Sequence, residues 1–391
     1  MPTTTTLPTT RTCPFDPPSE LRRLREEDPI RPLAYPDGHT GWLVTGYRAA
    51  RAVLSDARLS ARSELHHMPL ESLEPVPKAP GNFIFMDPPE HTRYRRLLTG
   101  QFTVRRMSQL IPRIEEITRK QLDAMEHVGP PVDLVEAFAL PIPSQVICEL
   151  LGVPYADHER FEQDTRTLVD LKATEAQRVA AGTDLATFLA QLIPAKRAEP
   201  QDDLLSGLVA ASDLADEDLV GVSLLLLVAG HETTANMLAL GTYTLLSHPD
   251  QLATLRADPS LVDGAVEELL RHLTILHLGT MRTALKDVEL DGHTIKAGQT
   301  VTISLSAANR DPERFSDPDR LDVTRDASGH LAFGHGIHQC LGQQLARVEM
   351  RIGYPALLRR FPELRLAVPP EEILLREDME IYGVHRLPVT W

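Results

Sequence analysis

The sequence predicts a mainly α-helical fold with small β-sheets, built as one large domain. Three observations support this: a run of 29 residues, 219–247, with one formal charge; segments with apolar residues at three- and four-residue spacing; and strand-like pieces that are few and short. The 391 residues are 42% hydrophobic and 24% charged, as in globular proteins. With no repeat or linker in view, we expect a flexible Thr/Pro-rich tail over residues 1–18 and one domain over 19–391.

Charge and cysteine content narrow the class of protein. The formal net charge is −15, which disfavours binding to nucleic acid or to an anionic membrane surface. Three widely spaced cysteines, Cys13, Cys148 and Cys340, do not form a disulfide framework and indicate a reducing compartment. The first residues contain no apolar signal or anchor segment, so we expect a cytoplasmic protein.

The apolar run 219–247 is long enough to cross a membrane, and this alternative has to be weighed. Glu232 lies near its middle, however, and a carboxylate at bilayer depth costs on the order of 3 kcal/mol. The residues just before the run are acidic rather than basic. We therefore predict a long helix buried inside a soluble protein.

Several shorter elements are also predicted. Segment 87–102 has Asp87 at an N-cap position and proline in the first turn, and then continues as an arginine-rich helix. Segments 260–273 and 340–361 have the spacing of amphipathic helices. Residues 288–305 are expected to form hairpins, with turns at Asp291-Gly292 and at Ala297-Gly298.

The most informative stretch is 333–342, FGHGIHQCLG, in which glycines allow tight backbone paths just before a helix. At a helix N-terminus, free N–H groups and the helix dipole stabilise a thiolate, the form in which Cys340 would bind a soft metal. Two other interpretations exist for such a cysteine. It could be a buried structural residue, or it could bind zinc together with His335 and His338.

Only one interpretation accounts for all ten residues. The string resembles, at every defining position, the haem-binding signature of the cytochrome P450 family, with Phe333, Gly334, His338, Cys340 and Gly342 in place. The resemblance extends from about residue 18 to 391. It implies the cytochrome P450 fold, with haem b between the long central helix and the helix that follows the cysteine. Cys340 would be the axial ligand of the iron.

Further residues match the family in the expected order. Glu268 and Arg271 share one helix face and can pair; with Arg325, the resemblance assigns them to a structural network that holds the cysteine loop. The resemblance also implies that the haem propionates bind cationic or N–H donors. These donors would be His91, Arg95, Arg282 and His338.

The stretch 229–234, AGHETT, matches the oxygen-binding part of the family's central helix. Ala229 and Gly230 would leave room over the iron, Thr233 would hold a water through its hydroxyl, and Glu232 would relay protons to it. Taken alone, these polar residues could simply bond to backbone carbonyls within a helix.

The activity implied is that of a monooxygenase, which inserts one atom of O2 into a substrate, by hydroxylation or epoxidation. No flavin or nicotinamide fingerprint is found, so we expect electrons from a ferredoxin and its reductase. A basic helix is the predicted docking surface, and the protein is expected to be a monomer. Rival classes are a haem-thiolate nitric oxide reductase or peroxygenase, and a haem gas sensor. The arginines of the basic helix are Arg93, Arg95, Arg96, Arg105 and Arg106.

The substrate is the least defined part. The resemblance places the pocket among segments 61–86, 160–195, 273–279 and 379–382, which are mostly apolar and suit a bulky lipophilic molecule. We expect a macrolide or other polyketide from secondary metabolism, with a xenobiotic, steroid or terpenoid as the alternative. The pocket candidates are Val222, Leu226, Ile275, Leu276, His277 and Ile381, of which the histidine is a potential polar anchor.

Overall fold

The computed structural model describes residues 5–70, 78–211 and 213–391, and its contacts group them into two compact units. The first comprises the described parts of Met1–Lys78, Ile84–Thr92 and Glu267–Leu341. The second comprises Ala79–Phe83, the described parts of Arg93–Val266, and Gly342–Trp391. The fold is mainly helical with small sheets, as predicted.

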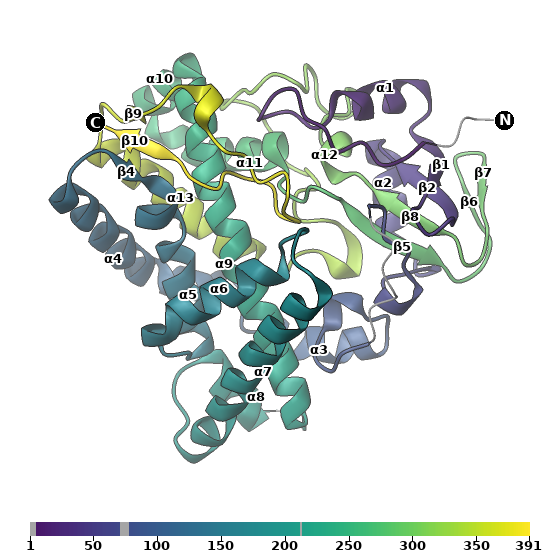
Figure 1. Cartoon of the computed structure of the whole chain (residues 1–391), viewed down its shortest axis with the longest axis horizontal. Helices are drawn as coiled ribbons and strands as arrows, with labels where there is room; N and C mark the ends of the chain where they lie inside the picture. The colour runs from purple at the N-terminus through teal and green to yellow at the C-terminus, as the bar shows by residue number, and fades with distance from the viewer. Residues whose placement is uncertain (1–4, 71–77, 212) are drawn as a thin grey trace. The chain divides into compact units, whose positions relative to one another are not determined.

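The first unit is built around a five-stranded sheet of order β1-β2-β8-β5-β3. Strands β2 and β8 are parallel, with Trp42 opposite Val301, and the other neighbours are antiparallel. Short helices and a hairpin, β6–β7, complete the unit (Figure 1). Its elements are α1 (Ser19–Glu27), β1 (Ile30–Ala34), β2 (Thr40–Val44), α2 (Tyr47–Ser55), β3 (Leu59–Ser60), η1 (Ser63–Leu65), β5 (Thr280–Ala284), β6 (Val288–Leu290), β7 (His293–Ile295), β8 (Thr300–Ile303), α12 (Leu305–Ala308) and η6 (Gly336–His338).

The second unit is a helical assembly around α9, along which α5, α7 and α13 pack (Figure 1). A three-stranded antiparallel sheet of order β4-β10-β9 joins the C-terminal strands β9 and β10 of this unit to β4. Its elements are α4 (Val104–Val128), β4 (Val132–Asp133), η3 (Val135–Ala139), α5 (Pro141–Leu151), η4 (Tyr155–Asp157), α6 (His158–Leu168), α7 (Glu175–Ala198), α8 (Leu204–Ala211), α9 (Asp216–Ser247), α10 (Pro249–Ala257), η5 (Pro259–Leu261), α13 (Gln343–Arg360), β9 (Arg365–Leu366), η7 (Pro370–Glu372) and β10 (Pro388–Thr390). Three elements have residues in both units: η2 (Phe83–Phe85), α3 (Glu90–Thr99) and α11 (Val262–Leu273).

Helix α9 contains the whole apolar run that the sequence singled out. By length and composition it could cross a membrane, but half of its most apolar window is buried inside the protein. Several of its polar side chains bond within the helix: Asn236 donates to the carbonyl of Glu232, and Thr242 to that of Leu238. The apolar run is thus a helix packed inside the protein over half of that window, with most of these polar groups bonded to its own backbone.

Several local predictions need correction. The basic helix is two helices, since α3 ends at Thr99 before Gly100 and α4 begins after Thr103, whose hydroxyl accepts from the N–H of Arg106. Asp87 does not cap α3, because its carboxylate accepts from Ser60 and Ala61 instead. Gly100 explains the break between α3 and α4, and the hydrogen bonds from Ser60 and Ala61 explain why Asp87 does not cap α3.

The strand region was predicted in part. Asp291 and Gly292 both have positive φ and form the two-residue turn of the β6–β7 hairpin. The turn at Gly298 makes no second hairpin, because β8 pairs with β2 and β5 rather than with β7. The described part of the expected tail, 5–18, also differs: Leu7 and Phe15 are buried, and Arg310 donates to the Phe15 carbonyl.

A buried ionic network organises the irregular chain between α12 and α13. Arg271, with no exposed surface, donates to both carboxylate oxygens of Glu268, at 2.6 and 2.8 Å, and to the carbonyls of Asn309 and Pro318. Arg325 adds a bond to Glu268 at 3.1 Å. One carboxylate therefore fixes two guanidinium groups that hold distant backbone segments.

We expect Glu268→Ala to lower the free energy of unfolding by about 3–5 kcal/mol, because it leaves the buried Arg271 without its counter-charge. The measurement is the urea unfolding midpoint. Glu267→Ala, on the same helix, is the matched control, since that carboxylate bonds to His330 at 3.1 Å and, unlike Glu268, stays partly exposed. Equal losses in the two variants would contradict the prediction.

Candidate active site

The cysteine loop lies in the first unit and depends on its glycines. Gly334 and Gly336 have positive φ, and a Cβ at Gly336 would lie 2.4 Å from the carbonyl oxygen of Leu54 in α2. The backbone N–H of Cys340 donates to the carbonyl of Phe333 at 2.9 Å, which closes the loop. The next helix, α13, begins three residues after the cysteine.

The Cys340 side chain is exposed, whereas Cys148 is buried and Cys13 is half-buried. A structural role in a core is therefore a poor account of Cys340. The zinc alternative is not supported either, since no cluster of three metal-ligating side chains occurs among the described residues. His335 lies near Arg51 at 3.4 Å, and His338 packs instead against His91.

The residues assigned to propionates are partly gathered in the first unit. The rings of His91 and His338 lie 4.2 Å apart between centroids, and His91 is almost fully buried. Arg282, on β5, is only 6% exposed. Arg95 lies on the part of α3 that belongs to the second unit and is half-buried.

Arg282 provides a test of whether the site suits an anionic cofactor. Its guanidinium donates only to the Met281 carbonyl and weakly to Thr280, and no ion pair joins it to a carboxylate among the described residues. Burial lowers the pKa of Arg282 to about 10, while nearby Asp87, whose oxygens are bonded to Ser60 and Ala61, opposes this effect. A buried cation without an anionic ligand is costly, and a carboxylate group such as a haem propionate would remove that cost.

The acid–alcohol pair lies on α9 in the second unit. The Thr233 hydroxyl donates to the carbonyl of Ala229 at 2.9 Å, so its lone pairs stay available to accept from a water. Glu232 is buried, whereas Ala229 is exposed and Gly230 and Thr233 are half-buried. The surface of α9 at Ala229, Gly230 and Thr233 is therefore accessible, although Glu232 between them is buried.

Gly230 has a packing role that the sequence did not suggest. A Cβ at this position would lie 2.7 Å from the side chain of Ile147 on α5. The next residue, His231, is fully buried, and its ring lies 3.0 Å from the Thr165 hydroxyl of α6. The glycine therefore allows α5 to approach α9 closely.

Sequence reasoning missed the partner of Glu232. Arg376 donates to the Glu232 carboxylate at 2.9 Å, and both side chains are less than 10% exposed. Arg376 belongs to an irregular C-terminal segment; its backbone N–H donates to the carbonyl of Gly383, where a Cβ would collide with Asn236 of α9. No local motif marks an arginine 144 residues from its partner, and the nearest signal is a single cation in a stretch of acidic and apolar residues, 371–381.

The substrate-pocket candidates differ in their surroundings. Val222, Leu226 and Ile381, in the second unit, are almost fully buried. Ile275, Leu276 and His277, in the first, are half-buried. Burial, assisted by Arg11, lowers the pKa of His277 to about 4, so the imidazole is neutral near pH 7. Of segment 61–86, residues 71–77 lie outside the described residues.

The buried Glu232–Arg376 pair predicts strong coupling. Glu232→Gln and Arg376→Gln should be non-additive by about 1–3 kcal/mol in a double-mutant cycle, because each single change leaves one buried charge alone. The coupling is measured from the free energies of unfolding of the wild type, the two single variants and the double variant, obtained by chemical denaturation. The Lys296–Asp287 pair, 2.8 Å long with both side chains exposed, is the control and should couple by less than about 1 kcal/mol. Additive losses at Glu232 and Arg376 would contradict the assignment.

The low pKa of His277 predicts a pH effect with a definite sign. The folded protein resists protonation down to about pH 4, while the unfolded chain takes up the proton near 6.5, so this contribution to stability is lost as the pH falls between those values. His277→Gln should reduce the loss of stability between pH 7 and pH 4 by about 2–3 kcal/mol. The measurement is the unfolding midpoint of wild type and His277→Gln at several values between pH 7 and pH 4. His127→Gln, which replaces an exposed histidine, is the control. Parallel pH curves for wild type and His277→Gln would refute it.

Known proteins resemble this chain in sequence and in fold. The family model described as Cytochrome P450 matches residues 177–381. Cytochrome P450 105C1 of a Streptomyces species is 55% identical and covers 99% of this chain and 98% of that protein. Two solved structures also match. CYP105P1 in complex with filipin I has a TM-score of 0.95 and 45% identity, and the match covers 100% of this chain and 99% of that one. The LnmA cytochrome P450 hydroxylase from the leinamycin biosynthetic pathway of Streptomyces atroolivaceus has a TM-score of 0.91 and 42% identity, and the match covers 100% of both chains. The family match and whole-chain similarity show that the chain belongs to the cytochrome P450 family and is a monooxygenase with a haem-thiolate cofactor.

Proposed function

We propose that this monooxygenase oxidises a bulky lipophilic natural product of macrolide or other polyketide type, in the cytoplasm, as a monomer with a single catalytic domain over 19–391. The observation that carries the proposal is the aliphatic, buried character of Val222 and Leu226 next to the accessible stretch of α9. The similar proteins of known structure support it: one was crystallised with filipin I, and another is a hydroxylase of a biosynthetic pathway. A xenobiotic, steroid or terpenoid substrate is the alternative.

We assign the cofactor contacts residue by residue. Haem b, when bound, supplies the activation of O2, and a cysteine ligand favours O–O cleavage. Cys340 would ligate the iron, and His91, Arg282 and His338, with Arg95, would bind the propionates. The Phe333 carbonyl and the two loop glycines hold the backbone of the cysteine in place.

The protein's own part in the chemistry is proton delivery. Arg376 and Asn236 both contact Oε2 of Glu232, which leaves Oε1 able to exchange a proton with a neighbouring water. Thr233, one residue on, would orient that water through its free lone pairs. His277 would offer a substrate a neutral imidazole rather than a cation, because burial lowers its pKa to about 4.

A spectral titration tests the substrate class. We expect one or more macrolides or other polyketides to shift the ferric haem from low to high spin, because a bound substrate displaces the axial water. Steroids, terpenoids and a xenobiotic of similar size form the comparison set. A spin shift confined to that set would replace the polyketide assignment with the alternative.

Electron delivery through an acidic ferredoxin predicts a dependence on two arginines. Arg96 on α3 is exposed and Arg105 on α4 is exposed, and neither has an ion pair among the described residues, whereas Arg93 and Arg106 pair with Asp213 and Asp202. Arg96→Glu or Arg105→Glu should lower the rate of haem reduction by a ferredoxin about tenfold at low salt, with the difference fading at high salt. Arg256→Glu, on the exposed side of α10, is the matched control. Equal rates for all three variants would exclude this docking surface.

A further inference from the structure

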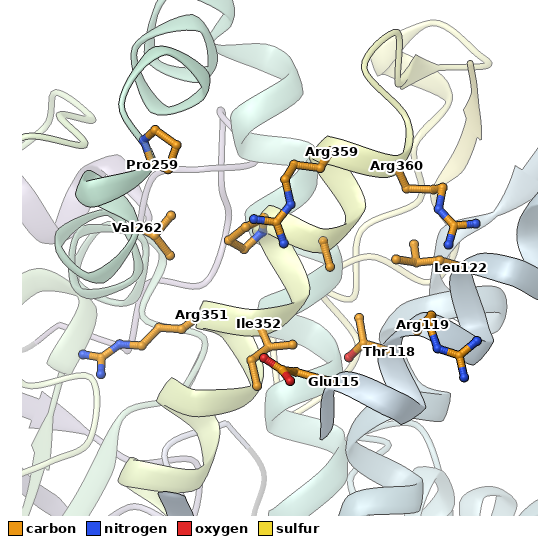
Figure 2. A pocket seen from close by; sticks show the side chains of 12 residues that line it. Glu115, Thr118, Arg119, Leu122, Pro259, Val262, Arg351, Ile352, Arg359 and Arg360 are labelled. Carbon is orange, nitrogen blue, oxygen red and sulfur yellow. The ribbon is translucent and has the colours of Figure 1, made fainter. Parts of the chain in front are cut away.

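A cavity of about 700 Å³ lies in the second unit, between α4, α13 and the turn that leads from η5 into α11 (Figure 2). Nothing in the proposed catalytic function uses it. Its volume is typical of sites that hold small organic molecules. It is lined by Glu115, Thr118, Arg119, Leu122, Pro259, Val262, Arg351, Ile352, Pro355, Ala356, Arg359 and Arg360.

The walls of this cavity are aliphatic. Leu122, Val262, Ile352, Pro355 and Ala356 supply them, and none of the twelve described lining residues is aromatic. Flat ring systems usually require a stacking partner, which is missing from this set. The walls therefore suit a saturated body such as an alkyl chain or an aliphatic ring.

Thr118 provides a buried polar group in the lining of the cavity. Its side chain is 1% exposed, and its hydroxyl has no hydrogen-bond partner among the described residues. Threonines elsewhere in the helices, Thr183 and Thr242 among them, donate to the carbonyl four residues earlier. The hydroxyl of Thr118 does not, although a buried hydroxyl without a partner is costly. A ligand with a polar group would satisfy it.

Arginines surround the cavity, but they are not equivalent. Arg119 and Arg360 pair with Asp123, and Arg351 pairs with Asp263. Arg359 is exposed and has no ion pair or hydrogen bond among the described residues. Figure 2 shows its guanidinium turned toward the side of Val262, away from the direction taken by Arg360. Its five N–H donors remain available to an anion.

We propose that this cavity binds a small aliphatic carboxylate, whose oxygens accept hydrogen bonds from Arg359 and from the Thr118 hydroxyl while the chain lies along the aliphatic walls. Glu115 is the one acidic lining residue and has no ion pair among the described residues. It disfavours a second negative charge, so a carboxylate fits better than a phosphate monoester, which carries nearly two charges near pH 7. The inference does not rest on the substrate proposed above.

The test uses decanoate and the haem-containing protein, with an iron-ligating azole filling the substrate pocket. The haem spectrum shows whether the azole binds. A failure of the haem assignment would therefore appear in the spectrum, independently of whether decanoate binds to the cavity. Isothermal titration should then show one decanoate bound per chain. Arg359→Gln should weaken it about tenfold or more, because a hydrogen bond to a charged group is lost, and Thr118→Val should weaken it by a smaller factor.

Controls distinguish this cavity from non-specific binding. Glu115→Gln should tighten decanoate binding, and Arg48→Gln, at an exposed arginine of α2 that does not line the cavity, should leave it unchanged. Decyl phosphate should bind more weakly than decanoate, and 1-decanol more weakly still. Absence of binding to the azole-saturated protein, or equal affinities in Arg359→Gln, Glu115→Gln and Arg48→Gln, would overturn the proposal. Tighter binding of decyl phosphate would overturn the choice of a carboxylate.

Discussion

The buried Glu268–Arg271 pair is the interaction on which the irregular segment that leads to the cysteine loop depends. Between α12 and η6 the described chain has almost no regular secondary structure, so few of its backbone groups can bond to each other in a ladder. Arg271 and Arg325 bond instead to carbonyls along this segment, and Asn309 joins it to Thr274 and to the N–H of Leu331. The loop that presents Cys340 is thus supported by side chains rather than by a sheet or helix.

The same device, a buried charge with a specified partner, recurs in the second unit. Glu232 would be unfavourable in the middle of an apolar helix, yet Arg376 and Asn236 satisfy it. In the first unit, Arg282 has only uncharged hydrogen-bond partners among the described residues. Pairing holds the Glu232 carboxylate in one position, whereas the lack of an ion pair suits Arg282 to bind an anionic group.

The parts of this protein that were predictable are those encoded by contiguous residues. The FGHGIHQCLG string, the long helix and the Asp291-Gly292 turn each place their signal within a few positions. Partners distant in sequence left no such signal: Arg376 reaches Glu232 only through the fold, and β8 joins β2 and β5 instead of its neighbour. The break between α3 and α4 was missed for another reason, because arginines stand on both sides of it, at Arg96 and Arg105, and suggest a single basic helix. The cavity between α4 and α13 arises from tertiary packing, which periodicity does not reveal.

The close approach of α5 to α9 at Gly230 has a consequence for engineering. A side chain there would have to displace the side chain of Ile147, so substitution would alter the packing of α5 against α9 before it altered selectivity. Neighbouring Ala229 has an exposed side chain and carries no such constraint. Directed evolution of this enzyme toward new compounds therefore has more room at Ala229 than at the adjacent glycine, where each larger residue requires Ile147 to repack.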